Sequence, residues 1–503
     1  MASKITPKIT QQQIQEIVAK YDPRKITIGV LGGHSALDVC QGVKKFGFRT
    51  LVIAQKGREK TYTDYYRVRS FWDVTKKEKS ASELRKESAE GCCGGKLAGT
   101  DACACSSEGA EKACGTGKSN CDEGACGCGG SKDKCCNDEV SDEAMDEFEE
   151  VEEEGAPSGG ASSCCGGGGC GSSGADEGSG CGSSSSQKQG FEIGCVDDVI
   201  VVDKFSDITN PAVQERLRKM NVIFVHNRYF WVYCDFEKIE SEFLVPIYGN
   251  RGAVKLEERD QPKNQYWLLQ EAGIRTPKIF KSYKNIDRLA IVKVNEATRG
   301  YERAFFLAAT PEQCLETAKK MAKDGRITME AFEKATIEEY ILGAHVNLNF
   351  FYSPLVNRVE LMGTDTRRQT NLDGFLRLPA DQQLEVLQHM QPKMIETGHY
   401  AVTMKESLVE KAYEIGRKFV DVMSKEVAPG MIGPFALQGA VVAEDGREEF
   451  VIFDVSMRIP GSPGTKFTPY SSYLFGDSLS YGERIGIELR SAINTDMLDS
   501  LLS

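Results

Sequence analysis

Loops that follow three apolar runs of the sequence carry residue types that bind anions. A Gly-Gly-His-Ser turn at residues 32–35 precedes a helical pattern, so its amides and the Ser35 hydroxyl could hold a phosphate at the positive end of a helix dipole. Cationic side chains follow two other runs, at Lys56-Gly57-Arg58 and His226-Asn227-Arg228. The sequence therefore predicts a shared anion site. A Ser35 that only caps its helix, and solvated loop charges, are the structural alternatives.

Lys293 lies inside an apolar strand pattern at residues 289–294. An unpaired charge in such a place is costly, so the lysine needs a nucleotide phosphate or a carboxylate such as Glu338 or Glu339 as its partner. The segment from Glu338 to Ile341 has the pattern of a strand that leaves the interior, and its backbone could hydrogen-bond a purine edge. Together these residues indicate a possible nucleotide site.

Gln438 and Asp454 are polar residues within two apolar strand patterns that a Glu-Asp-Gly turn at residues 444–446 separates. A hairpin would bring their oxygen atoms together, and oxygen ligands suit magnesium. A salt bridge from Asp454 to Arg458, four residues further on, is an equally good alternative. The glycine-rich segment 459–465 that follows could close over a bound anion.

A parallel sheet is the element that could bring the first group of loops together. Apolar strands and helices alternate, which is typical of a βαβ arrangement with ligands at the carboxyl ends of the strands. The pattern stops near residue 79 and resumes at Val196, so we expect residues 1–78 and 196–250 to form one α/β domain interrupted by an insertion at 79–195. The predicted elements are an amphipathic segment at 13–21, buried strands at 26–31, 50–54, 198–203 and 221–226, and helices through Phe46 and at 211–220.

The second half of the chain is predicted to be an α+β body with antiparallel strands. We divide it into a small subdomain at 251–345 and a C-terminal subdomain at 346–503. The first has predicted strands at 289–294, 304–308 and 336–341 and a helix at 311–323. The second has predicted strands near 346–352, 358–363, 435–442 and 449–455 and helices near 406–426 and 479–497.

The acidity of the chain belongs to its insertion. The net charge of the 503 residues is −12, whereas residues 91–190 alone carry 19 acidic and 6 basic side chains and hold 14 of the 18 cysteines. The rest is nearly neutral, which argues against a basic nucleic-acid-binding body. The inserted cysteines lack zinc-finger spacing. A disordered linker is favoured over a thiol-rich, metal-binding tether, because the segment has too few apolar residues to form a core.

No apolar run is long enough to span a bilayer and none follows the first charged residues, so a cytoplasmic protein without a membrane partner is expected.

Eight segments of the chain, in order, resemble the archaeal formate-dependent 5-formaminoimidazole-4-carboxamide ribonucleotide (FAICAR) synthetases. The resemblance covers nearly the whole chain except about residues 80–194. It implies an ATP-grasp fold and a ligase of purine biosynthesis that formylates 5-aminoimidazole-4-carboxamide ribonucleotide (AICAR monophosphate) with formate and ATP through a formyl phosphate. The segments are Leu31–Ser35, Lys56–Arg58, Phe243–Arg251, Ile337–Tyr340, Phe351–Pro354, Asn371–Gly374, Lys405–Ser407 and Pro429–Phe435.

The resemblance also implies roles for single residues. As partners of the whole protein it implies small-molecule substrates, no nucleic acid and a second copy of the chain in a homo-oligomer. The residues concerned are His34, Ser35, His226 and Lys405 for AICAR monophosphate; Lys293 for the ATP phosphates; Glu338, Glu339, Tyr340 and Ile341 for adenine and ribose; Gln438 and Asp454 for Mg²⁺ or Mn²⁺; and Arg458, with Lys293, for catalysis.

The chain departs from the family pattern at several of these places. The segment after Lys293, residues 295–300, has one glycine where the family has a glycine-rich phosphate lid. Asn227-Arg228 and Pro460 also differ from the residues that the family pattern suggests. A diverged ligase with another substrate, or a nucleotide-binding sensor without catalysis, therefore stands as the alternative.

Overall fold

A computed structural model describes residues 4–70, 192–258, 261–294, 304–390, 395–444 and 446–503. All of them belong to one compact unit, which the segment from 84 to 188 interrupts in sequence. The predicted Cys/Gly-rich insertion lies almost entirely outside the described residues, as does the predicted lid at 295–300. The predicted domain boundaries stay predictions.

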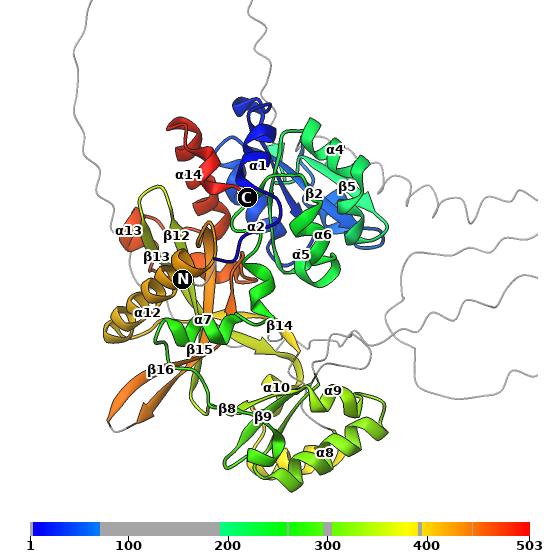
Figure 1. Cartoon of the computed structure of the whole chain (residues 1–503), viewed down its shortest axis with the longest axis vertical. Helices are drawn as coiled ribbons and strands as arrows, with labels where there is room; N and C mark the ends of the chain where they lie inside the picture. The colour runs from blue at the N-terminus through cyan, green and yellow to red at the C-terminus, as the bar shows by residue number, and fades with distance from the viewer. Residues whose placement is uncertain (1–3, 71–191, 259–260, 295–303, 391–394, 445) are drawn as a thin grey trace, which may run out of the picture. The chain divides into compact units, whose positions relative to one another are not determined.

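The N-terminal region contains a parallel five-stranded sheet in the order β5-β2-β1-β6-β7 (Figure 1). The strand order reverses between β1 and β6, so the loops after these two strands leave the sheet side by side. The sheet and its neighbouring helices are β1 (Thr27–Leu31), β2 (Arg49–Gln55), β5 (Asp198–Val202), β6 (Val222–Val225), β7 (Ile247–Tyr248), α1 (Gln11–Val18), α2 (Ala36–Lys44) and α4 (Pro211–Lys219).

The predicted strands of this sheet are confirmed, with one difference in burial. Every residue of β1 and β6 is buried, as continuous apolar runs in a sheet covered on both faces should be. The strand β5 was expected to be buried as well, but it lies at the edge of the sheet and Val201 is 47% exposed. An apolar run cannot distinguish a central strand from an edge strand, because both bury at least one face.

The middle of the chain folds into an antiparallel four-stranded sheet in the order β10-β9-β11-β8. Burial alternates along β9, so Val292 faces the core beneath the helices while Lys293 faces the opposite side. The helix α8 begins at Pro311 after the N-cap Thr310. The elements are β8 (Ile279–Phe280), β9 (Ala290–Val294), β10 (Ala304–Ala308), β11 (Thr336–Glu339), α8 (Pro311–Lys323) and α9 (Met329–Glu333).

The C-terminal region is built on an antiparallel five-stranded sheet in the order β14-β13-β12-β15-β16, against which the long helix α12 packs (Figure 1). Four strands and α12 lie where they were predicted. The strand β14, a polar segment at the sheet edge, was not predicted, nor were α10 and α11 before it. The elements are β12 (Ala344–Ser353), β13 (Arg358–Gln369), α10 (Thr370–Phe375), α11 (Ala380–His389), β14 (Glu396–Ala401), α12 (Glu406–Glu426), β15 (Gly433–Glu444), β16 (Arg447–Ser456) and α14 (Tyr481–Asn494).

Short elements connect these sheets. No helix within the described ranges is both long and apolar enough to cross a membrane. The connecting elements are η1 (Pro23–Lys25), η2 (Thr61–Tyr65), β3 (Arg69–Ser70), β4 (Glu192–Ile193), η4 (Phe205–Thr209), α5 (Arg228–Tyr233), α6 (Phe236–Ser241), η5 (Val254–Glu257), α7 (Gln265–Glu271), η6 (Tyr283–Asn285), η7 (Pro463–Phe467), α13 (Ser472–Phe475) and η8 (Leu498–Leu501).

The helix α14 joins the two ends of the chain by packing against α2 at two glycines. A Cβ atom on Gly482 would lie 2.0 Å from the carbonyl oxygen of Asp38, and one on Gly42 would lie 2.1 Å from the amide nitrogen of Glu483. The backbones of the two helices therefore touch. Because α2 begins directly after Ser35, this contact also fixes the end of the turn at residues 32–35, which was predicted to bind an anion.

We predict that Gly482→Ala lowers the free energy of unfolding by about 1–3 kcal/mol or more, because the added methyl group forces the two helices apart. Thermal or denaturant unfolding measures this loss. Gly464→Ala is the control, since a Cβ atom there meets nothing within 4 Å. Equal stability of the two variants would show that the α2–α14 contact is not tightly packed.

Candidate functional site

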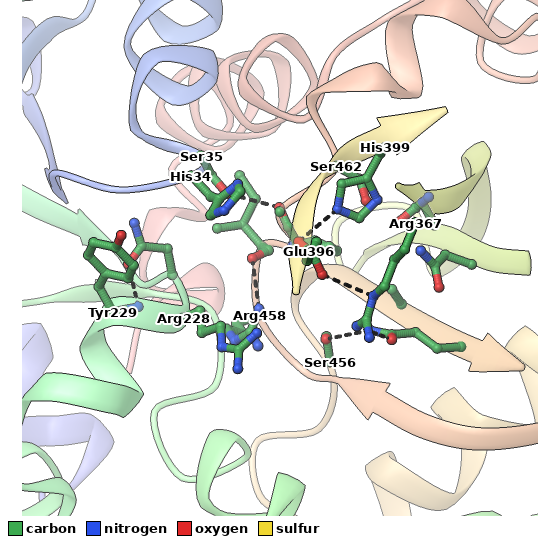
Figure 2. Close-up of a pocket in the computed structure, with 18 residues that line it drawn as sticks. His34, Ser35, Arg228, Tyr229, Arg367, Glu396, His399, Ser456, Arg458 and Ser462 are labelled. Atoms are coloured by element: carbon green, nitrogen blue, oxygen red, sulfur yellow. Dashed lines mark hydrogen bonds and ion pairs between the residues drawn. The ribbon is translucent and has the colours of Figure 1, made fainter. Parts of the chain in front are cut away.

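A pocket that is partly open to solvent lies between the carboxyl ends of β1 and β6 and the antiparallel five-stranded sheet (Figure 2). Loops and strands from both ends of the chain contribute to its wall. The lining residues are His34 and Ser35 after β1; Asn227, Arg228 and Tyr229 after β6; Asn347, Asn349, Arg367, Glu396, His399, Ala436, Gln438 and Ser456 from the sheet; and Arg458, Ile459, Pro460, Gly461 and Ser462 after β16.

Hydrogen bonds join the loops at the point where the strand order of the parallel sheet reverses. The Asn227 amide donates to the carbonyl of Leu31 at 2.9 Å and so ties the loop after β6 to the end of β1. The Ser35 hydroxyl donates to the carbonyl of Pro460 at 2.9 Å and makes no capping bond to α2. The alternative in which Ser35 only caps its helix is therefore wrong. Instead, Ser35 ties the glycine turn to the loop after β16.

Three arginines bring positive charge into this pocket. Reduced hydration of the Arg228 guanidinium, followed by repulsion from Arg458 and Arg367, lowers the pKa of Arg228 below its usual value. Arg458 lies 3.4 Å from the Glu257 carboxylate, and both side chains are about nine-tenths buried. Cations that repel one another around an open space favour an anion between them, so the pocket suits a phosphate or carboxylate group.

On the sheet side, His399 and Arg367 enclose one carboxylate, as Figure 2 shows. The ring of His399 lies 3.2 Å from Asp365 and 3.0 Å from Glu396, and Nε of Arg367 lies 3.0 Å from Glu396. Burial opposes the charge on His399, but bonds to the two carboxylates outweigh it and raise the pKa of His399 to about 9. For Glu396, His399 and Arg367 outweigh burial and lower its pKa to about 2. Both groups are charged at neutral pH.

Sequence reasoning did not identify this group, although one signal was present. Arg367 lies four residues beyond the strand predicted at 358–363, which in the structure continues to Gln369. His399 and Glu396 lie on the strand β14, which the sequence pattern did not indicate. The predicted glycine-rich segment does contribute to the pocket, since residues 459–462 line its wall.

Two residues predicted to bind substrate lie elsewhere. The ring of His226 is buried with Nδ1 3.2 Å from the carbonyl of Tyr248, and burial lowers its pKa to about 4, so the ring is neutral. Gly249, with φ of 114°, leaves room for this ring, because a Cβ atom there would lie 2.6 Å from it. His226 thus supports the loop whose next three residues line the pocket. Lys405 is an exposed residue that pairs with Glu448 at 2.6 Å.

The residues predicted to bind ATP form a second group outside the lining of this pocket. Lys293 is nine-tenths buried and pairs with Glu338, one of the two carboxylates expected as alternatives to a phosphate partner. The Tyr266 hydroxyl lies within hydrogen-bond distance of Glu338 and, at 3.0 Å, of the carbonyl of Phe453, and its single hydrogen is shared between these two acceptors. The three remaining residues lie at the end of β11 and just after it. Glu339 pairs with Arg288 at 3.2 Å, the Tyr340 amide donates to Leu289, and the backbone of Ile341 bonds the ring of His345.

Gln438 and Asp454 lie directly opposite one another on β15 and β16, as the predicted hairpin requires. The side-chain oxygen of Gln438 accepts a bond from Arg367, and its amide lies 3.5 Å from the Ser456 hydroxyl. In the described part of the chain, no three His, Cys, Asp or Glu side chains cluster as a complete metal site. One amide and one carboxylate oxygen fit Mg²⁺ only if phosphate oxygens or waters complete the shell, which is common for nucleotide-bound magnesium.

Comparison with known proteins identifies two matching family models, both described as having unknown function. The model DUF1246 matches residues 28–91 and 183–280, and DUF1297 matches residues 313–503. A 5-formaminoimidazole-4-carboxamide-1-(beta)-D-ribofuranosyl 5'-monophosphate synthetase from Methanocaldococcus jannaschii is 39% identical over 309 residues, which are 61% of this chain and 83% of the relative. A protein of the same name from Methanopyrus kandleri is 38% identical over 62% of this chain and 84% of the relative.

Among solved structures, the IMP biosynthesis protein PurP from Thermococcus kodakaraensis superimposes with a TM-score of 0.51 at 20% identity. The match covers 95% of this chain and all of that protein. This likeness confirms the predicted fold class, an ATP-grasp fold preceded by a parallel-sheet domain.

We predict that Arg228→Gln weakens the binding of inorganic phosphate roughly tenfold, the loss expected for one hydrogen bond to a charged group. Phosphate that binds the folded protein stabilises it in proportion to the logarithm of 1 + [phosphate]/Kd, so a phosphate titration followed by thermal unfolding measures the affinity. The control is Arg24→Gln, because Arg24 is 90% exposed on η1. Equal loss in both variants, or in neither, would contradict the assignment of the pocket to an anion.

Proposed function

Because the chain belongs to the family of FAICAR synthetases, we propose that it uses ATP to join formate to the 5-amino group of AICAR monophosphate in IMP biosynthesis. The 39% identity with a synthetase of which the chain spans 83% is the observation that carries the proposal. The pocket is consistent with it, because AICAR monophosphate is a phosphate monoester and the wall is rich in cations.

We assign the phosphate of AICAR monophosphate to the half of the pocket at the carboxyl ends of β1 and β6. His34 and Ser35 come from one loop there and Arg228 from the other. The hydroxyl of Ser35 already donates to Pro460, so it keeps lone pairs rather than a hydrogen for a ligand. Backbone amides, His34 and Arg228 are therefore the donors that a phosphate would meet first.

ATP is assigned to the second group of residues. Lys293 would contact the ATP phosphates while keeping Glu338 as a partner, because its ammonium has three N–H donors and a buried Glu338 left without its cation would be costly. The backbone from Glu339 to Ile341 passes from the four-stranded to the five-stranded sheet and would line the adenine pocket. The lysine and this segment are the features by which the structure supports a nucleotide site.

The chemistry that follows requires two anions to meet, since formate attacks the terminal phosphate of ATP to form formyl phosphate. Arg458, which pairs with Glu257, would neutralise the charge that develops. Gln438 and Asp454 would hold the magnesium, which when bound screens the phosphate oxygens during transfer. The amine of AICAR then attacks the formyl carbon and phosphate leaves.

The predicted cytoplasmic location and homo-oligomeric state stay predictions.

The direct test is incubation of the purified protein with ATP, Mg²⁺, formate and AICAR monophosphate. We expect FAICAR and ADP in equal amounts, both dependent on formate, as chromatography or absorbance would show. ADP formation with a different acid or amine, and none with formate, would instead indicate a diverged ligase. Nucleotide binding without turnover under all these conditions would indicate a sensor.

A second prediction concerns Lys293. We expect Lys293→Ala to raise the KM for ATP at least tenfold, because a charge-assisted contact to the phosphates is lost. Lys334→Ala is the matched control, since Lys334 belongs to the same region but forms an exposed pair with Glu330. If Lys293→Ala retains the ATP affinity of the unmodified protein, Lys293 does not bind the phosphates.

A further inference from the structure

His399 is the residue on which the carboxylate cluster of the pocket depends. Its side chain is 8% exposed, and it lies on β14 directly opposite Arg367 of β13. One ring nitrogen faces Asp365 and the other faces Glu396. A neutral imidazole has a single N–H, so only the imidazolium can donate toward both carboxylates. Carboxylates on both sides of the ring therefore favour its charged form.

We propose that His399 is a positioning residue for the reaction, which as an imidazolium holds Glu396 and, through Glu396, Arg367 against Gln438. This inference rests on the proposed function. The contacts form a continuous path across the sheet. Nε2 of His399 lies 3.0 Å from one oxygen of Glu396, the other oxygen lies 3.0 Å from Nε of Arg367, and the far end of Arg367 donates to Gln438.

The position of β14 at the edge of the sheet explains why side-chain contacts are needed to hold it. The strand pairs on one side only, with β13, and the pairing is irregular at Arg368/Gln369. Few backbone bonds hold an edge strand, so its side chains must fix it in place. Asp365 on β13 holds the inner side of the His399 ring. It is 1% exposed and also accepts hydrogen bonds from the side chains of Asn347 and Asn349.

The charged groups around this cluster indicate how loss of the His399 charge would affect substrate binding. His34, Arg228 and Arg458 come from the three surrounding loops, and Tyr481 of α14 lies near Asp365. With His399 uncharged, Arg367 would be the remaining ion-pair partner of Glu396, and the single N–H of the ring could bond only one of the two carboxylates. Its carboxylate would then be able to turn toward the cationic loops, where it would compete with an anionic substrate. Loss of the ring charge should thus impair substrate binding and turnover without removing a group that reacts.

The test compares steady-state kinetics of His399→Gln and His399→Lys with the unmodified protein. We expect His399→Gln to lower kcat/KM for AICAR monophosphate about 10- to 100-fold with a smaller change in the KM for ATP. His399→Lys keeps a cation and should recover part of this loss. Activity of the unmodified protein should fall as the pH rises through about 9, where the ring loses its proton. In His399→Lys that fall should move upward, toward the ordinary lysine pKa of about 10.4.

Two further variants separate positioning from folding. His389→Gln is the matched control, because His389 is exposed on α11 and contacts a single carboxylate, Glu385, at 3.0 Å. Glu396→Gln should reproduce most of the loss, and the double variant His399→Gln/Glu396→Gln should lose less than the product of the two single effects, because both act through one contact. Unchanged kcat/KM in His399→Gln and in Glu396→Gln, or the same alkaline limb in His399→Lys, would overturn the proposal.

Failure of the proposed function would be recognised separately. If the unmodified protein forms no FAICAR, the function is wrong, yet the positioning role still predicts weaker binding of inorganic phosphate by His399→Gln than by His389→Gln in thermal unfolding. Equal phosphate binding in those two variants would refute the positioning role on its own.

Discussion

The pocket depends on carboxylates that stand behind its cations. Several positive side chains around one open space repel each other, and each would be costly to bury alone. The structure meets this constraint with Glu257 behind Arg458 and with Glu396 between Arg367 and His399. Burial raises the pKa of Glu257 to about 6, although Arg458 and the Met457 amide oppose the shift. The paired cations remain close enough to the pocket to attract an anion.

The carboxylate of Glu257 also helps to complete the β16 edge of the antiparallel five-stranded sheet. On the outer side of β16, side chains take the place of a neighbouring strand. The Val455 amide donates to the Gln265 side chain at 2.7 Å, and the Met457 amide donates to Glu257 at 2.6 Å. Because Arg458 follows Met457 directly, the bond that terminates the strand also sets the position of the arginine. Glu257 thus both ends the β16 edge of the sheet and positions the charge of Arg458.

Tyr266 connects this region to the group assigned to ATP. Its hydroxyl bonds Glu338 of the four-stranded sheet and the carbonyl of Phe453 on β16, next to Asp454. The lysine of the nucleotide group and the strand of the predicted magnesium ligands therefore share one side chain. If ATP binds at Lys293 as proposed, a shift of Glu338 would be transmitted to the hairpin of Gln438 and Asp454, because Glu338 has both Lys293 and Tyr266 as partners.

The sequence by itself determined the strands and helices whose apolar periodicity is strong, the helix starts at Pro311 and Glu406, and the opposition of Gln438 and Asp454 across a hairpin. Ordered motifs along the chain also determined its family. Only the tertiary structure decided that His226 supports the pocket from within the core, that Lys405 lies apart from it, and that His399 and Glu396 belong to it. The physical reason is that periodicity reports which face of an element is buried. Which charges become neighbours depends on how the sheets and loops pack, and the polar edge strand β14 carries no apolar signal of its own.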